Sequence, residues 1–139
     1  MTSQLNVDTI VDKAGSGGTN VKIGNTSTYV SEGGAVTQNT VQGLAKWFAT
    51  HRGDFSNAVE DSFNVASHTD TGTGGVTYTF TNNMGNTDYC PHVSGISGDH
   101  LISSEGDVST TSCRFGHYNQ SNSLADTGFS SHSAVGDLA

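Results

Sequence analysis

The sequence predicts an all-β protein, a small antiparallel β-sandwich or barrel preceded by an extended N-terminal segment. The clearest observation is that Val76, Tyr78 and Phe80 alternate with threonines, a period of two that is typical of a half-buried strand. In addition, Ser, Thr, Gly and Asn supply 65 of the 139 residues. These residues suit strands with polar outer faces joined by many turns, and they do not favour a helical globule.

The alternating strand belongs to a predicted hairpin. Phe63 and Val65 are also two apart, which predicts a shorter strand on the N-terminal side. Between the two strands lies His68–Gly75, whose glycines can adopt the positive φ angles of a turn. We therefore expect Phe63, Val65 and the alternating apolar residues to share one inner face.

The segment before the hairpin is ambiguous. Residues from Asn39 onward fit one face of a helix, but Leu44–Thr50 also fits a strand with Trp47 and Ala49 opposite Phe48. We predict a short helical or irregular piece up to Gly43 and a strand after it.

Four further strands are expected after the hairpin. Their predicted bounds are Asp88–Ser94, Asp99–Ser103, Val108–His117 and Phe129–Leu138. Pro91 would place the first of them at a sheet edge or a bulge. In the third, Cys113, Phe115 and His117 would share one face, with Arg114 on the other.

The N-terminal third contains extended patterns, such as Leu5–Val11 and Asn20–Ile23, but almost no core of its own. We divide the chain into a docking or stem segment (1–40), a connecting segment (41–60) and a C-terminal β-sandwich tip domain (61–139). Leu, Ile, Val and Phe together make up only 27 of the 139 residues, so we expect oligomerisation to supply much of the stability. Leu44, Trp47 and Phe48 are the predicted residues of the interface between subunits.

Charge and composition exclude several classes of partner and site. A net charge of −8 argues against nucleic-acid binding, and no apolar run is long enough for membrane insertion. The first ten residues lack the pattern of a signal peptide. Cys90 and Cys113 could form one structural disulfide or remain two buried thiols.

Neither a metal site nor a catalytic site is predicted within one chain. The six histidines show no His-x-His or His-x₃-His spacing, although a three-fold axis could still gather three copies of one histidine. Asp99, Glu105 and Asp107 could imitate the carboxylates of a glycosidase, but such residues are common in turns. Cys90 and His92 would share a strand face without an orienting acid. We therefore expect no catalytic residue and no cofactor.

The order of several segments resembles a known family. These segments are Val41–Trp47, Asp61–Val65, Thr71–Gly75 and Val76–Asn82, with Leu5–Gly18 near the start and Ser131–Ala139 at the end. They resemble the short tail-fibre and related appendage proteins of bacteriophages, notably those of marine bacteria. The resemblance implies a homotrimeric virion protein, assembled in the cytoplasm of the bacterial host, that docks on other virion proteins through its N-terminal segment. It also implies contact with a host cell-surface glycan or receptor.

Strand alternation predicts which loops would meet the host. If the strands run up and down, loops 68–75, 95–98 and 118–128 lie at the distal end, and loops 82–87 and 105–107 lie at the proximal end. A tyrosine beside amides suits sugar rings and hydroxyls, although a polar loop whose tyrosine packs against the domain explains the same residues. The predicted receptor-binding residues are Asp70, Thr71, Tyr118, Asn119, Gln120 and Asn122.

The sequence thus predicts a structural fibre component that contributes to host attachment. The alternative is a stand-alone carbohydrate-binding β-sandwich, and a third reading is a tip that degrades polysaccharide.

Overall fold

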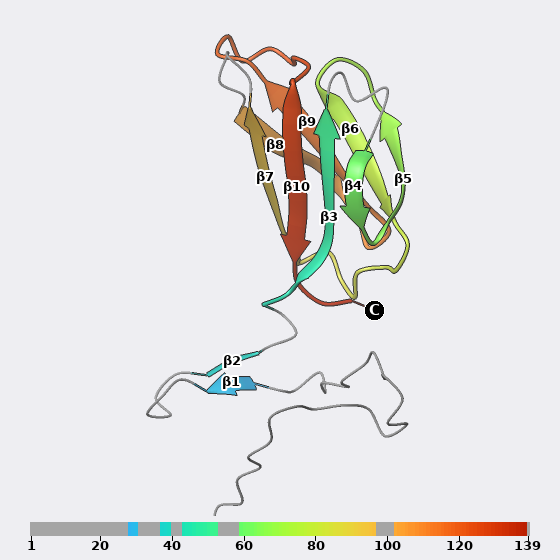
Figure 1. Ribbon diagram of the computed structural model, residues 1–139, viewed down its shortest axis with the longest axis vertical. Coiled ribbons are helices and arrows are strands. Elements are labelled where there is room, and N and C mark those ends of the chain that lie inside the picture. Colours follow the sequence, from blue (N-terminus) through green and yellow to red (C-terminus); the bar gives the residue numbers. More distant parts are fainter. Residues whose placement is uncertain (1–27, 31–36, 40–42, 53–58, 97–101, 139) are drawn as a thin grey trace, which may run out of the picture.

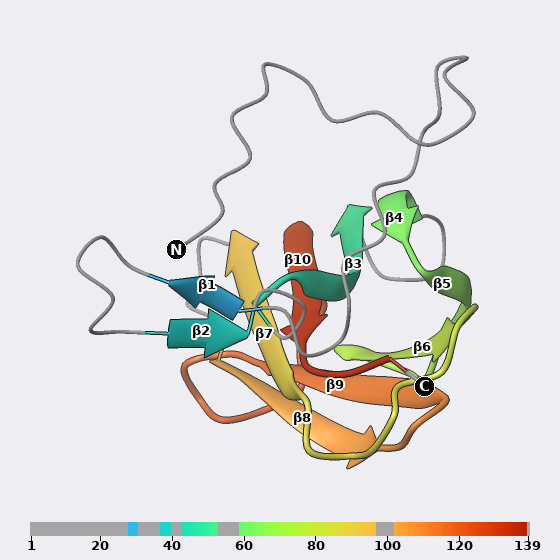
Figure 2. The ribbon, with the colours of Figure 1, turned by 90° about the horizontal axis from the view of Figure 1, so that it is seen from below.

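The computed structural model describes residues 28–30, 37–39, 43–52, 59–96 and 102–138. Most of these residues form two four-stranded antiparallel sheets that face each other (Figure 1). Sheet I has the strand order β4-β3-β10-β7 and sheet II the order β5-β6-β9-β8. Figure 2, which looks from below, shows them as two layers. The predicted β-sandwich is therefore confirmed.

The strand bounds follow the chain in order. Sheet I contains β3 (Ala45–Arg52), β4 (Val59–Phe63), β7 (Cys90–Ile96) and β10 (Phe129–Val135). Sheet II contains β5 (Val65–Asp70), β6 (Gly75–Phe80), β8 (Ile102–Val108) and β9 (Ser112–Tyr118). A separate two-stranded sheet pairs β1 (Thr28–Val30) with β2 (Thr37–Asn39). The sandwich takes in residues 45–52 and 59–63, most of which our division assigned to a connecting segment. The predicted strands Leu5–Val11 and Asn20–Ile23 lie outside the described residues, as do residues 40–42 of the predicted helical or irregular piece.

The core is filled by alternate residues of the facing sheets. Val76, Tyr78 and Phe80 are buried, as the alternation predicted, and so are Cys113 and Phe115 of β9. Trp47 of β3 lies against this layer, with its ring centroid 5.5 Å from Tyr78, 5.3 Å from Phe80 and 5.9 Å from Phe115. The remaining core residues are Ala49, Met84, Tyr89 and Ala134.

The position of Trp47 corrects one prediction. Its side chain is 0% exposed within a single chain, so it has no surface with which to contact a neighbouring subunit. The prediction of a trimer interface is therefore wrong for Trp47. Phe48 is half-buried on the opposite face of β3, and Leu44 is 60% exposed. These two residues remain predicted interface residues.

The prediction that Phe63 and Val65 belong to the same strand is also wrong. Asn64, which separates them, has a φ of 58° and carries the chain from β4 in sheet I to β5 in sheet II. Its amide nitrogen donates to the carbonyl oxygens of Lys46 and Asn82, both at 3.0 Å, and its oxygen accepts from the Asn82 N–H at 2.7 Å. Asparagine tolerates this left-handed conformation better than most residues. Phe63 consequently lies on the outside of sheet I and is 52% exposed.

Other strand boundaries differ from the predicted ones because of local turns and bulges. Ser109 forms a turn in which its hydroxyl oxygen accepts from the N–H groups of Thr111 and Ser112. The predicted strand Val108–His117 therefore begins only at Ser112, and Glu105–Asp107, predicted as a loop, belongs to β8, next to a bulge. β7 is an edge strand, which agrees with the position expected for Pro91.

Candidate functional site

Three histidines and one tyrosine form a continuous chain of hydrogen bonds between the two sheets. The Tyr78 hydroxyl oxygen lies 2.6 Å from Nδ1 of His51 and 2.7 Å from Nδ1 of His132. Nε2 of His132 lies 3.1 Å from Nε2 of His117. Nδ1 of His117 lies 3.1 Å from the carbonyl oxygen of Gly74. We call this series, from His51 to Gly74, the histidine–tyrosine chain.

Strand periodicity brings these side chains together. His51 follows Trp47 and Ala49 on the inner face of β3, and His132 occupies the inner face of β10, where it pairs with Ala49. His117 is the last inward-facing residue of β9. Alternation directs all three histidine side chains to the inner faces, and the register of β10 with β3 places His132 opposite Ala49, two residues before His51.

The Gly74 carbonyl fixes the direction of every hydrogen bond when all three histidines are neutral. A carbonyl oxygen only accepts, so His117 must carry its proton on Nδ1 and accept at Nε2. His132 then donates from Nε2 and accepts at Nδ1, so the Tyr78 hydroxyl donates to His132. The hydroxyl in turn accepts from Nδ1–H of His51. The network allows one assignment of protons and no other.

Burial keeps these groups uncharged. Desolvation lowers the pKa of His51 to about 4, with smaller contributions from His68 and His117. Desolvation also lowers the pKa of His132, and the neighbouring His117 and His51 lower it further. The pKa of His117 is lowered by desolvation, against which the hydrogen bond to Gly74 and the Asp126 carboxylate act to raise it. Burial raises the pKa of the Tyr78 phenol, with Cys113 adding to the effect.

The histidine–tyrosine chain does not form an accessible catalytic site. All four side chains are at most 1% exposed, so no substrate can contact them without opening of the sandwich. Among the residues that the structure describes, no group of three or more His, Cys, Asp and Glu side chains is arranged to hold a metal ion.

The predicted receptor-binding residues of the β9–β10 loop lie at one end of the sandwich, but most are engaged in the loop itself. The Asn119 amide oxygen accepts from the N–H groups of Ser121 and Ser123, both at 3.0 Å, which occupies both of its lone pairs. Asn122 adopts a positive φ of 56° to close the turn. Tyr118 is half-buried and pairs with Leu124, and Gln120 is exposed.

Asp70 is the last residue of β5, and Thr71 follows it in the β5–β6 turn; both are exposed. This turn lies at the same end of the sandwich (Figure 1). Asp70 accepts from the Gly72 N–H at 2.8 Å, which shapes the turn. The turn contacts the β9–β10 loop, because the Gly74 N–H donates to the Asp126 carboxylate at 2.6 Å. The expected grouping of these loops at one end agrees with the structure. It gathers Asp70, Thr71 and residues 118–122 at that end.

A second surface, which the sequence reasoning did not identify, lies on the outer face of sheet I. An open hollow of about 290 Å³ extends over β3, β10 and β7. Outward-facing side chains around it are those of Phe48, Thr50, His92, Ser94, Ser131 and Ser133. None of these is Asp, Glu, Lys or Arg, so the hollow combines an aromatic ring, hydroxyl groups and one imidazole. We call it the sheet I hollow.

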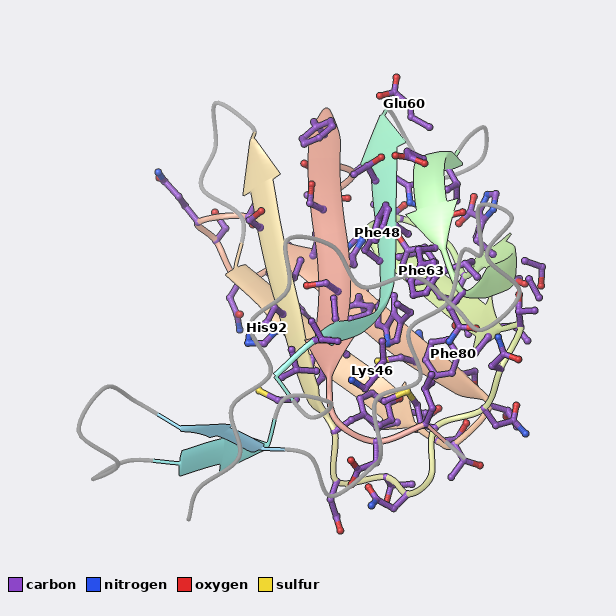
Figure 3. All side chains as sticks on the ribbon, turned by 60° about the horizontal axis from the view of Figure 1, so that its bottom comes forward. Lys46, Phe48, Glu60, Phe63, Phe80 and His92 are labelled. Carbon is purple, nitrogen blue, oxygen red and sulfur yellow. The ribbon has the colours of Figure 1, made fainter. Side chains whose placement is uncertain are left out.

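Phe48 and Phe63 together form an aromatic surface beside the hollow. Its ring lies nearly parallel to that of Phe63, with centroids 6.2 Å apart and an interplanar angle of 24°. Figure 3 shows these two rings next to each other and His92 across the sheet on β7. One signal for this surface was present in the sequence. Trp47 and Phe48 are adjacent in a strand, so their side chains must point to opposite faces, and one aromatic ring had to lie outside the core.

The other residues considered in the sequence do not assemble into a site. Cys90 and Cys113 do not form a disulfide, because Cys90 is exposed on β7 and Cys113 is buried on β9. Cys90 Sγ lies 3.8 Å from Nε2 of His92. Asp107 is exposed, whereas Asp99 and the side chain of Glu105 lie outside the described residues.

No protein-family model, curated protein or solved structure was found to match this chain. Across the part of the chain that the structure describes, there is no helix long and apolar enough to cross a membrane.

Proposed function

We propose that this chain is a non-enzymatic attachment component of a bacteriophage appendage, and that its sandwich binds a neutral glycan of the host surface. The binding surface in this proposal is the sheet I hollow. It is the single observation that carries the proposal, because it is an open, mixed aromatic and hydroxyl surface large enough for a sugar ring.

The chemistry of the hollow favours a sugar over other ligands. The apolar face of a pyranose ring packs on an aromatic side chain, and its hydroxyls pair with hydroxyl and imidazole groups. In this proposal Phe48 supplies the aromatic face, in place of its predicted role at a subunit interface. Ser131, Ser133 and His92 would supply hydrogen bonds along β10 and β7. Among the described residues that line it there is no Lys or Arg, the side chains that would favour a phosphate or carboxylate ligand.

The course of the chain supports an attachment role. β3 begins at the end of the sandwich where β10 finishes, and the β5–β6 turn and β9–β10 loop lie at the opposite end (Figure 1). A stem that precedes β3 would therefore join the sandwich at the end away from these loops. Residues 1–40 would dock on other virion proteins, and sheet I and the distal loops would point outward. Three copies in a homotrimer would gain avidity from weak individual sites.

A monomeric, stand-alone carbohydrate-binding β-sandwich is the second candidate. It is favoured by the complete burial of Trp47 within one chain, since the interior needs no residue from another subunit. Light scattering on the purified chain separates the two candidates. A trimer supports the fibre component, whereas a monomer at micromolar concentration contradicts it and leaves the glycan-binding module.

Glycan binding is tested by affinity electrophoresis through gels that contain neutral polysaccharides, namely a mannan, a galactan and several glucans. We expect retardation by at least one of them, with the affinity of Phe48→Ala reduced about tenfold, equivalent to about 1.4 kcal/mol. Leu138→Ala, which removes an exposed apolar side chain elsewhere, is the matched control. If Tyr118→Ala abolishes the retardation and Phe48→Ala does not, the binding site lies at the β9–β10 loop and not at the sheet I hollow. No retardation on any gel would contradict glycan binding.

A further inference from the structure

The histidine–tyrosine chain connects two positions that could each hold a proton, and its hydrogen bonds have a defined direction. In the neutral state all of them point from His51 towards Gly74. The same four groups have one other arrangement that keeps all four of these hydrogen bonds, in which the added proton is carried by the buried Nε2 of His51. In it Tyr78 donates to His51, His132 donates from Nδ1 to Tyr78, and His117 donates from both nitrogens, to His132 and to Gly74. This second arrangement contains one additional proton.

The two arrangements differ by a balanced series of proton transfers. One proton is added at Nε2 of His51, and the proton on its Nδ1 moves to the Tyr78 oxygen. The original Tyr78 proton moves to Nδ1 of His132, and the proton on Nε2 of His132 moves to Nε2 of His117. Each residue that receives a proton also gives one up except His117, so the positive charge resides on His117 alone.

The surroundings of the chain favour His117 as the charged residue. His117 contacts the Gly74 carbonyl, which also accepts the His117 backbone N–H at 2.8 Å, and the nearby Asp126 carboxylate attracts positive charge. At the other end, the His51 ring lies 4.9 Å from the His68 ring, and this neighbour adds to the lowering of the His51 pKa. His132 lies between His117 and His51, and Cys113 of β9 faces Tyr78.

We propose that the histidine–tyrosine chain is a one-proton relay, in which mild acid charges His117 and reverses the hydrogen bonds as far as His51. The charged His117 attracts the Asp126 carboxylate, which also accepts from the Gly74 N–H at 2.6 Å. The relay thus connects the protonation state of the core to the contact between the β5–β6 turn and the β9–β10 loop. A second proton could be added only by breaking one of the four hydrogen bonds of the chain.

The test is a pH titration of the full chain with ¹⁵N-labelled histidine, with the tautomer of each imidazole read by long-range ¹H–¹⁵N NMR. The expected result is that His117 becomes doubly protonated below pH 6.5. With the same midpoint, His51 changes completely from Nδ1–H to Nε2–H and His132 from Nε2–H to Nδ1–H, both remaining uncharged. Tautomers of His51 and His132 that stay constant while His117 is charged would overturn the relay. So would a charged His51 or His132 that precedes His117, or the absence of any protonation before the protein unfolds.

Three variants test the connection within the relay. Tyr78→Phe interrupts the chain, and the His51 tautomer is expected to stop following the His117 midpoint. Asp126→Asn keeps the chain intact and is expected to shift the His117 midpoint downward, because it removes the attracting carboxylate. Asp88→Asn removes an exposed carboxylate outside the chain and is expected to leave the coupled midpoints unchanged. If Tyr78→Phe does not fold, the coupled midpoints of the unmodified protein and of Asp126→Asn decide the question.

Discussion

Tyr78→Phe would remove a single oxygen atom from the middle of the sandwich while keeping the aromatic ring. The ring contacts with Trp47 and Phe115 would remain, at centroid distances of 5.5 and 6.0 Å. Two hydrogen bonds, of 2.6 and 2.7 Å, would be lost. Because Tyr78 is 0% exposed, water could not take the place of the hydroxyl without opening the core.

The expected loss follows from the groups left behind. Nδ1–H of His51 and the acceptor Nδ1 of His132 would each lose the Tyr78 partner. An unsatisfied buried polar group costs about 1–3 kcal/mol, and part of this is regained because Phe needs no desolvation of a hydroxyl. We therefore expect the free energy of unfolding to fall by about 2–4 kcal/mol.

Urea unfolding at pH 7.5 measures this effect, with fluorescence of Trp47, the only tryptophan, as the probe. Tyr118→Phe is the matched control, because Tyr118 is half-buried beside the β9–β10 loop, and its variant is expected to change stability by less than about 0.5 kcal/mol. If the free energy of unfolding of Tyr78→Phe were within about 0.5 kcal/mol of that of the parent protein, the two hydrogen bonds of Tyr78 would not stabilise the fold as argued.

Four other predictions concern stability. The pKa of each buried histidine in the folded state lies below its value in the unfolded chain. The free energy of unfolding is therefore highest above about pH 6.5 and falls with decreasing pH, by up to about 2 kcal/mol per histidine at pH 5. Urea unfolding at a series of pH values checks this, and a free energy that does not change with pH contradicts it. Asn64→Ala should cost about 1–3 kcal/mol in the same assay because it removes the bonds that join β4 to β5, and an unchanged midpoint would refute that role. Trp47→Ala should cost about 3–5 kcal/mol, whereas Phe48→Ala should cost clearly less, and similar losses would argue against Trp47 as the centre of the core. Gly74→Ala should lower the melting temperature, because an added Cβ would lie 2.7 Å from the His117 carbonyl oxygen at a φ of +69°; a melting temperature equal to that of the parent would contradict this contact.

The fold was predictable where alternation and turn residues agreed. The period of two over Val76–Phe80 predicted β6 and its buried face, and the inward positions of Cys113, Phe115 and His117 followed from the same rule. Asn64 is the exception to this rule. Its positive φ carries the chain from sheet I to sheet II, so Phe63 lies on the outer face and not on the inner face that alternation predicts. Nothing in the spacing of Phe63 and Val65 distinguishes one strand from two.

The candidate sites were less predictable because both depend on pairing between distant strands. His51, His117 and His132 have no sequence spacing that suggests contact, and only the register of β3, β10 and β9 places them in one row. The sheet I hollow likewise depends on the neighbouring positions of β3, β10 and β7. Composition suggested a core too thin for one chain, but a core made of large aromatic rings with hydrogen-bonded histidines fills the sandwich with few aliphatic residues.

The most direct test of glycan binding on sheet I is an NMR titration of the ¹⁵N-labelled chain with fragments of the neutral polysaccharide that retards it most strongly. The account predicts that the amide signals of Thr50, Ser94, Ser131 and Ser133 shift with increasing ligand, while those of Ser121 and Ser123 stay in place. Shifts confined to the β9–β10 loop, or no shifts in any signal, would contradict it.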